Sequence, residues 1–380
     1  MPTLHVVADG NMPHVEAWLT GRVQSLVRQA GRTLSSADLA GADVLLVRSV
    51  TQVNQALLQG TPVRFVGSAT IGTDHIDLDY LQQQQIPFAY APGCNAQSVA
   101  DWLLSILSRL HLDHDLCWWQ QTIGVVGVGN VGSVVVARLR QLGVRVLVCD
   151  PEKHQQGLLP DHLDLAALVA SCDILCLHTP HTRTGPNPTD QLFDQALLAT
   201  LRPGAWLINA GRGPVVVADA LLQRLRGGEL NAVLDVWPEE PRVPQALLAE
   251  VALASPHVAG YSLEGRANGT AMIARQLAQW AGLSLPDAVP RPPVRPLEAG
   301  LYYQDDIRQW ASELVLAVYD PARDTATLGC SVQDGQVDAA MFDSLRKHYP
   351  TRRELHSVPI AQAPPALRDW LSRLGFSRFM

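Results

Sequence analysis

The sequence predicts an α/β protein with two doubly wound parallel-sheet domains and a small C-terminal α+β domain. Three observations support this fold class. Short apolar runs alternate with helical patterns along most of the chain, which is typical of strands joined by covering helices. This alternation begins twice, near the N-terminus and again at Thr122. A proline-rich stretch at 285–300 then separates these two series from a tail of different character.

The first series contains the apolar runs LHVVAD, DVLLVRS and RFVGSAT, with a predicted helix at 14–29 between the first two. The second series contains IGVVGVG, VRVLVCD, DILCLHT, AWLINAG and AVLDVW. Continuous apolar runs of this length are typical of strands that are covered on both faces. A helical pattern at 99–110 joins the two series, and 257–280 predicts a turn followed by a return helix.

The tail carries apolar residues at helical spacing. One stripe consists of Ile307, Trp310, Leu314 and Ala317, and another of Phe342, Leu345 and Tyr349. Between them, Asp320-Pro321 is typical of a helix start, with proline at the first helical position. A tail without catalytic motifs must still bury these stripes, so we predict that it pairs with a second copy to form a homodimer.

Composition restricts the class of protein. A chain of 380 residues suggests two or three domains at about 150 residues each. No apolar run reaches the roughly 18 residues of a membrane span, and the first ten residues lack a secretion signal. We therefore expect a cytoplasmic protein without a membrane partner. The net charge of −7 disfavours binding to nucleic acid.

The six cysteines do not form a recognisable metal site. None forms a CxxC pair, and Cys172 and Cys176 lie four apart without a second pair to complete a zinc site. We expect reduced thiols and no bound metal.

A glycine-rich turn opens the second series. Its residues are Gly127, Val128, Gly129, Asn130, Val131 and Gly132, a GxGxxG between a strand and a helical pattern. In a dinucleotide site the first glycine makes the turn, the second admits the pyrophosphate, and the third packs helix on strand. Asp150 ends the next strand, about 20 residues on, where an acid binds ribose hydroxyls. Its charge would repel a 2′-phosphate, so we predict NAD as the cofactor.

Three later segments place polar residues at or beyond predicted strand ends. They are INAGRG with Arg212, LDVWPEEP with Asp235 and Glu240, and SPHVAG with His257. Oxidation of a hydroxy acid needs a cation for the carboxylate, a base for the hydroxyl proton and a carboxylate that orients the base. Arg212, His257 and Glu240 supply these groups and are the predicted catalytic residues. From the residues alone, Glu239 is an alternative to Glu240.

The order Arg, Glu, His on these segments resembles the D-isomer-specific 2-hydroxyacid dehydrogenases, over roughly residues 1 to 285. The resemblance implies two Rossmann-like domains, the first interrupted by the second. It selects Glu240, because this family places the acid directly before the proline. It also implies that Asp235 lies near the nicotinamide amide. The remaining implied cofactor contacts are Thr179, Ala210, Gly211, Arg212 and Gly260.

The first series suggests the substrate. Arg48 and Ser49 follow one strand, Thr70 follows another, and Tyr261 lies in the segment GYSLEGRANGT. These segments and the tail resemble one branch of the family, which oxidises a small phosphorylated D-2-hydroxy acid to a 2-oxo acid. The resemblance implies substrate contacts for Ser49, Thr70 and Tyr261, and makes Arg48 a candidate phosphate or carboxylate ligand.

Domain boundaries follow from the same resemblance. The substrate-binding domain is expected at 1–94 and 258–285, the NAD-binding domain at 95–257 and a dimerisation domain at 286–380. Two rival functions stay open at this point. One is oxidation of another phosphorylated hydroxy acid, such as 3-phosphoglycerate. The other is an NAD-sensing transcriptional corepressor of the same fold, which a turnover assay would distinguish.

Overall fold

The computed structural model describes residues 4–380 and confirms the predicted fold class. The chain divides into two compact units, each built around one parallel sheet. Unit 1 comprises residues 1–95 and 261–293, and unit 2 comprises residues 96–260 and 294–380. No helix within residues 4–380 is long and apolar enough to cross a membrane.

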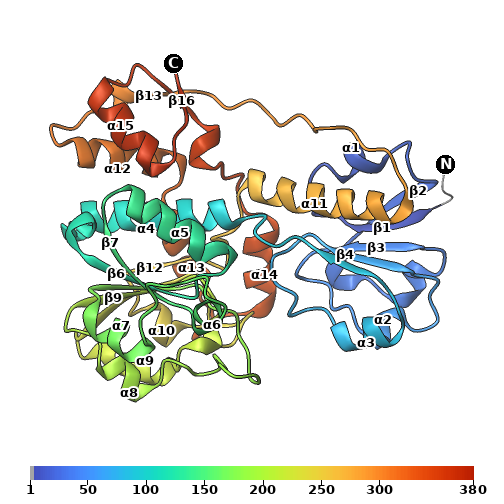
Figure 1. Ribbon diagram of the computed structural model, residues 1–380, viewed down its shortest axis with the longest axis horizontal. Helices are drawn as coiled ribbons and strands as arrows, with labels where there is room; N and C mark the ends of the chain where they lie inside the picture. The colour runs from blue at the N-terminus through green and yellow to red at the C-terminus, as the bar shows by residue number, and fades with distance from the viewer. Residues whose placement is uncertain (1–3) are drawn as a thin grey trace. The chain divides into compact units, whose positions relative to one another are not determined.

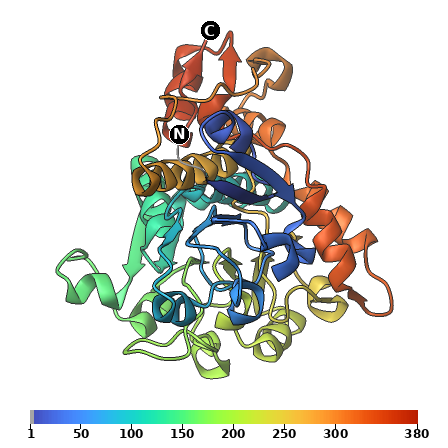
Figure 2. The same ribbon diagram turned by 90° about the vertical axis from the view of Figure 1, so that its right-hand side faces the viewer.

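Unit 1 is a five-stranded parallel sheet in the order β2-β1-β3-β4-β5. Its strands are β1 (His5–Asp9), β2 (Ser25–Gln29), β3 (Val44–Val47), β4 (Phe65–Ser68) and β5 (Phe88–Tyr90). Its α-helices are α1 (Val15–Leu19), α2 (Gln55–Leu58), α3 (Leu78–Gln83) and α11 (Leu263–Ala281). Figures 1 and 2 show α11 alongside α1 and the N-terminal strands, and its Ile273 and Leu277 are fully buried there.

The helix predicted over 14–29 is wrong in its second half. The helix ends at Leu19, and Ser25–Gln29 is the edge strand β2, paired in parallel with β1. As an edge strand it has one neighbour only, and its residues are half-buried or exposed. It therefore lacks the continuous apolar run that identified the central strands.

Unit 2 is a six-stranded parallel sheet in the order β12-β10-β9-β8-β6-β7. Its strands are β6 (Thr122–Val126), β7 (Arg145–Cys149), β8 (Ile174–Leu177), β9 (Ala205–Asn209), β10 (Leu230–Leu234) and β12 (Leu253–Ala254). Its helices up to residue 260 are α4 (Ala96–His114), α5 (Asn130–Gln141), α6 (Pro151–Gln155), α7 (Leu165–Ser171), α8 (Gln195–Ala199), α9 (Ala218–Arg226) and α10 (Gln245–Leu248).

The chain runs outward from β6 to β7 and then returns to the other side of β6 for β8. This reversal is the switch point at which open α/β sheets bind ligands, outside the carboxyl ends of the strands. In Figure 1, α4 and α5 cover one face of the sheet, and α7 and α9 cover the other.

The C-terminal segment, residues 294–380, is part of unit 2. It contains α12 (Ile307–Val318), α13 (Pro321–Cys330), α14 (Ala339–Lys347) and α15 (Pro365–Leu374). A parallel sheet joins β13 (Leu297–Glu298), β15 (Pro359–Ala361) and β16 (Arg378–Phe379), and β14 (Gln336–Val337) pairs antiparallel with β11 (Val243–Pro244).

The apolar stripes of the tail are covered by this same chain. Leu314 of α12 is fully buried in the core that α4 and α5 share with the sheet, and α12 packs along α4. Phe342 of α14 is fully buried in the core on the other face, with Trp237 and Val243. These stripes pack against the core of their own chain, so their burial does not by itself require a second copy.

Candidate active site

The glycine-rich turn has the form that a dinucleotide site requires. Gly127 has a φ of +84°, which favours glycine. A Cβ on Gly132 would lie 1.9 Å from the Gly127 carbonyl oxygen, so the start of α5 packs directly on the turn. A Cβ on Gly129 would meet nothing within 4 Å, which leaves that backbone open to approach. The turn thus combines close packing with an open helix N-terminus, as pyrophosphate binding needs.

Asp150 lies directly after β7. Its Oδ2 accepts a hydrogen bond from the Val128 N–H at 2.8 Å, and its Oδ1 accepts one from the Lys153 N–H at 3.1 Å, capping α6. The carboxylate is therefore fixed beside the glycine-rich turn. An anion held there is suited to ribose hydroxyls and opposed to a 2′-phosphate.

His178 and Thr179 follow β8, the strand beside β6. The Thr179 hydroxyl is buried and has no hydrogen-bond partner within residues 4–380. A Cβ on Gly127 would lie 2.9 Å from the His178 carbonyl carbon, so the two strand ends touch. Burial lowers the pKa of His178 to about 4, which keeps its ring neutral. An unsatisfied buried hydroxyl beside the glycine-rich turn fits a site completed by a bound cofactor.

Ala210, Gly211 and Arg212 follow β9. The Gly211 N–H donates to Asn209 Oδ1 at 3.0 Å, and Asn209 Nδ2 donates to the Arg212 carbonyl at 3.1 Å. A Cβ on Gly211 would lie 2.8 Å from the Thr179 carbonyl oxygen, so only glycine fits this approach. Asn209 thus closes a tight turn that places the half-buried Arg212 at the carboxyl end of the sheet.

Asp235 lies after β10 and is almost completely buried. It accepts hydrogen bonds from the Ser255 hydroxyl at 2.5 Å, the Val258 N–H at 2.8 Å and the Ala259 N–H at 3.0 Å. Burial raises the pKa of Asp235, against the lowering effects of the His257 charge and these donors. Asp235 therefore organises the turn from Ser255 to Ala259. Gly260 follows this turn and ends the first segment of unit 2, residues 96–260.

His257 occupies that turn in the left-handed region, with φ of 56°. A non-glycine residue there costs about 1–3 kcal/mol, which the surrounding structure must offset. The His257 N–H donates to the Asp235 carbonyl oxygen at 2.7 Å. The strained backbone is thus held by bonds on both sides of the histidine.

Glu240 and His257 form a close pair. Glu240 Oε2 lies 2.6 Å from His257 Nδ1, and Glu240 Oε1 accepts the Trp237 N–H at 2.9 Å. The neighbouring Glu239 is exposed. Burial works to raise the pKa of Glu240, but the charge and hydrogen bond of His257, with a smaller effect of Arg346, lower it below its usual value. Glu240 is therefore a carboxylate that fixes one ring nitrogen and leaves Nε2 for chemistry.

The predicted substrate residues lie in unit 1. Arg48 and Ser49 follow β3, and Thr70 follows the adjacent β4, so both loops leave the same edge of the sheet. The Arg48 guanidinium stacks over the Tyr261 ring at 5.4 Å. The Thr70 hydroxyl is 2.7 Å from that of Ser68 and donates to the Gly72 carbonyl at 2.9 Å. Unit 1 thus gathers a cation, hydroxyls and an aromatic ring.

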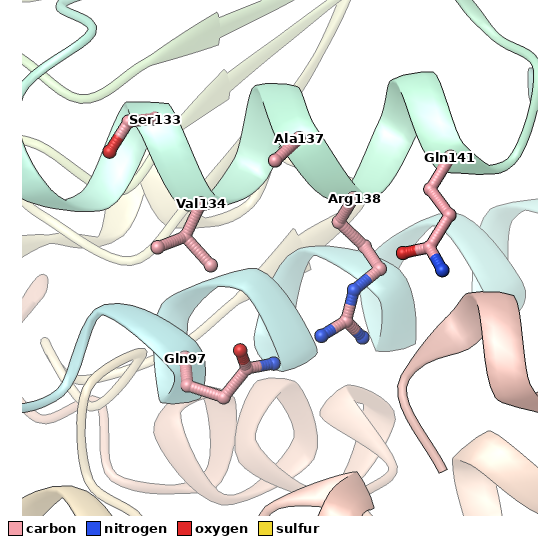
Figure 3. A pocket seen from close by; sticks show the side chains of 6 residues that line it. All are labelled: Gln97, Ser133, Val134, Ala137, Arg138 and Gln141. Atoms are coloured by element: carbon pink, nitrogen blue, oxygen red, sulfur yellow. The ribbon is translucent and has the colours of Figure 1, made fainter. Parts of the chain in front are cut away.

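A separate hollow of about 310 Å³ lies between α4 and α5 (Figure 3). It is lined by Gln97, Ser133, Val134, Ala137, Arg138 and Gln141. None of these is a predicted site residue. Across residues 4–380 no group of three or more His, Cys, Asp or Glu side chains is arranged to hold a metal ion, and all six cysteines are free.

The fold and these residues define the class of protein. Residues 112–259 match the NAD binding domain of the D-isomer specific 2-hydroxyacid dehydrogenases, and residues 289–375 match a domain of unknown function, DUF3410. Among solved structures, the chain is similar to D-lactate dehydrogenase from Aquifex aeolicus complexed with NAD and lactic acid. That match has a TM-score of 0.62 and 23% identity, and covers 73% of this chain and 96% of that one.

Whole-chain relatives give the branch. The chain is 46% identical to erythronate-4-phosphate dehydrogenase of Pseudomonas putida (strain GB-1), covering 97% of this chain and 98% of the relative. It is 45% identical to the enzyme of the same name from Azotobacter vinelandii, covering 98% and 99%. The chain therefore belongs to the erythronate-4-phosphate dehydrogenases, a branch of the D-isomer-specific 2-hydroxyacid dehydrogenases. The resemblance stated from its motifs is confirmed.

The structure adds three groups to the predicted site residues. Ser255 bonds Asp235, His178 lies buried beside Thr179, and Arg352 of the C-terminal segment donates to the Ala259 carbonyl. Ser255 in SPHVAG and His178 in DILCLHT were detectable as polar residues at strand ends. Nothing local marks Arg352, because its partner is distant in sequence.

Proposed function

We propose that this protein oxidises 4-phospho-D-erythronate to (R)-3-hydroxy-2-oxo-4-phosphooxybutanoate with NAD, a step in pyridoxal 5′-phosphate (vitamin B6) biosynthesis. The observation that carries the chemistry is the contact of 2.6 Å between Glu240 and His257. The substrate rests on relatives of that name that match nearly the whole chain.

The protein groups divide the reaction between them. His257 Nε2 takes the proton of the C2 hydroxyl as hydride leaves C2, so the imidazole becomes a cation. Glu240 orients the ring and stabilises that cation. Arg212 binds the substrate carboxylate, for which its planar fork is suited.

NAD, when bound, supplies the hydride acceptor. We propose that the glycine-rich turn and Asp150 hold its pyrophosphate and ribose. Its other contacts are assigned to Thr179, Ala210, Gly211, Arg212, Asp235 and Gly260. Supporting this, the turn offers an open helix N-terminus and Thr179 an unsatisfied hydroxyl.

In unit 1, Ser49, Thr70 and Tyr261 are proposed substrate contacts, with Arg48 as a ligand for phosphate or carboxylate. The stacking of Arg48 over Tyr261 favours a shared role, because it limits the orientations of the guanidinium. Arg48→Lys should therefore raise KM for the phosphorylated substrate more than it lowers kcat.

The deciding assay measures NADH formation with 4-phospho-D-erythronate, 3-phosphoglycerate and D-lactate in parallel. We expect kcat/KM to be highest for 4-phospho-D-erythronate. Preference for 3-phosphoglycerate would assign the chain a different substrate. Absence of turnover with all three, together with tight NADH binding, would favour the NAD-sensing function.

Cofactor choice has its own test. Wild type should prefer NAD. Asp150→Asn removes the charge and keeps one of the two acceptor oxygens, so it should narrow the ratio of kcat/KM with NAD to kcat/KM with NADP. Equal use of both cofactors by wild type would contradict the role given to Asp150.

The proposed assembly is a homodimer formed through the C-terminal segment, in the cytoplasm. Leu301 and Tyr303 in this segment are 80% and 61% exposed, which is unusual for large apolar side chains. The six free thiols suit a reducing compartment. Light scattering should give a dimer for wild type and a monomer for Leu301→Glu/Tyr303→Glu. A dimer that survives both changes would place the interface elsewhere.

A further inference from the structure

The C-terminal segment reaches the turn that carries His257. Within unit 2, Arg352 donates a hydrogen bond to the carbonyl of Ala259, two residues beyond His257. Its side chain is 6% exposed although it carries a permanent charge. A buried guanidinium is costly unless its position is fixed by several partners.

Besides its hydrogen bond to Ala259, Arg352 is held by an aromatic ring and by the charge of nearby acidic groups, while its Nη1 has no hydrogen-bond partner within residues 4–380. The guanidinium lies 4.6 Å from the centre of the Tyr319 ring. The hydroxyls of Tyr319 and Tyr349 both donate to Asp324, at 2.7 and 2.8 Å. Burial by itself would lower the pKa of Arg352, but the neighbouring acidic groups of Tyr349, Tyr319, Asp324 and Asp235 raise it. Arg352 is thus a fixed cation that links a C-terminal cluster to the Asp235 turn.

Two further contacts bind the segment to the same region. Thr325 of α13 accepts the Ala254 N–H at 2.9 Å and donates to its carbonyl at 3.2 Å, at the end of β12 just before the His257 turn. Strand β14 pairs with β11, which begins two residues after Pro241. The helix α13 lies beside β12 in Figure 1. Both halves of the Glu240–His257 pair are therefore supported by the C-terminal segment.

The backbone at His257 explains why such support matters. This residue has a left-handed φ of 56°, which relaxes unless neighbouring bonds hold it. Asp235 binds the N–H groups on the far side of the turn, and Arg352 binds its carbonyl at Ala259. We infer that Arg352 is a positioning residue for His257, holding the turn that aims the imidazole at Glu240.

This inference rests on the proposed function, and a double-mutant cycle separates the two. In the full-length protein, Arg352→Met should lower kcat by about 10–100-fold, as expected when an orienting group is lost. KM for 4-phospho-D-erythronate and the dissociation constant of NADH should change much less. Arg352→Lys keeps the charge and one donor, so it should recover part of the loss.

In a His257→Ala background, Arg352→Met should change the residual turnover within about twofold, because the group it positions is gone. Equal losses in both backgrounds, or an unchanged kcat, would overturn the inference. Normal turnover of His257→Ala alone would overturn the proposed acid/base and the inference with it. If Arg352→Met does not fold, Arg352→Lys takes its place in the cycle and is judged by the same criteria.

Arg138 offers a matched control. It is a mostly buried arginine in the same unit, and it also donates to a backbone carbonyl, that of Leu374. It projects from α5 toward α4, as Figure 3 shows, and its hydrogen bond and ion pair lead to Leu374 and Asp101 rather than to the His257 turn. Arg138→Met should lower the melting temperature yet leave kcat within about twofold of wild type. If Arg138→Met lost as much kcat as Arg352→Met, the loss would follow from removing any buried arginine of this unit. That result would also overturn the inference.

Discussion

Glu240 and Asp101 are both carboxyl groups that unit 2 shields from solvent. The titratable group with the largest effect on the pKa is a histidine for Glu240 and a second carboxyl for Asp101. Glu240 contacts His257 and the Trp237 N–H. Its pKa is lowered despite burial by these contacts and by the charge of Arg346. Asp101 faces Glu354, and burial together with that second carboxyl raises its pKa to about 7.

The Asp101 site joins α4 to the C-terminal segment. Asp101 accepts the Leu355 N–H at 2.8 Å, and the Ser98 hydroxyl donates to Glu354 at 2.7 Å. Arg138 remains 3.8 Å from the Asp101 carboxylate. Burial acts to raise the pKa of both carboxyls. At Glu240 the charge and hydrogen bond of His257 outweigh burial, whereas at Asp101 the second carboxyl adds to burial and Arg138 does not offset the two. One carboxylate is available for chemistry, while the other holds a structural proton near neutral pH.

The largest effect is expected when His257, the partner of Glu240, is removed. His257→Ala should lower turnover about 10²–10⁴-fold, the usual contribution of a positioned acid/base. Steady-state NADH formation measures this loss, and fluorescence titration should show NADH still bound. Near-normal turnover would show that some other group takes the proton.

Removing the anion should cost less. Glu240→Gln keeps the shape but not the charge that favours protonated imidazole, so turnover should fall by about 10–100-fold. The acidic limb of the pH–rate profile should move to lower pH for the same reason. Glu239→Gln is the matched control, since that side chain is exposed, and it should behave as wild type. If the two variants lost equal activity, the contact with His257 would not explain the effect.

The second site predicts a pH effect on stability. Folded Asp101 keeps its proton up to about pH 7, whereas an unperturbed aspartate loses it near pH 4. The folded state therefore binds more protons between these values, and this group makes stability fall as pH rises through that window. Asp101→Asn should make stability fall less steeply with pH. The melting temperature of the variant should therefore rise relative to that of wild type from pH 5 to 7.

Thermal unfolding at several pH values measures this difference. Asp113→Asn, on the same helix but with a largely solvent-accessible carboxylate, is the control and should leave the slope unchanged. A parallel offset of Asp101→Asn at every pH would contradict the raised pKa.

The smallest effect concerns the hydroxyl that binds Glu354. Ser98→Ala should destabilise by about 1–3 kcal/mol, because a buried acceptor loses its donor. Ser105→Ala is a comparison on the same helix. Its hydroxyl donates to the Asp101 backbone carbonyl, so the substitution should cost less. Denaturant unfolding of both variants would rank them, and the reverse order would deny that Glu354 depends on Ser98.

Several site features were predictable because their signals are local. In Gly127–Gly132 the spacing of glycines encodes a turn, and in INAGRG and SPHVAG the polar residues directly follow apolar strands. Parallel strands present their carboxyl ends at one edge, so these segments had to meet. The proline after Glu240 added a local marker, and the structure pairs Glu240, rather than Glu239, with His257.

The sequence by itself therefore determined the fold class and the motifs that line the sheet edge. Only the tertiary structure decided where the tail packs and what it supports. A helical stripe shows that one face of α12 must be buried, but it does not name α4 as the covering surface. Arg352 and Ala259 are 93 residues apart, and neither carries a local signal for the other. Such a contact arises when separately formed elements pack together, so its partners depend on the whole arrangement of the unit.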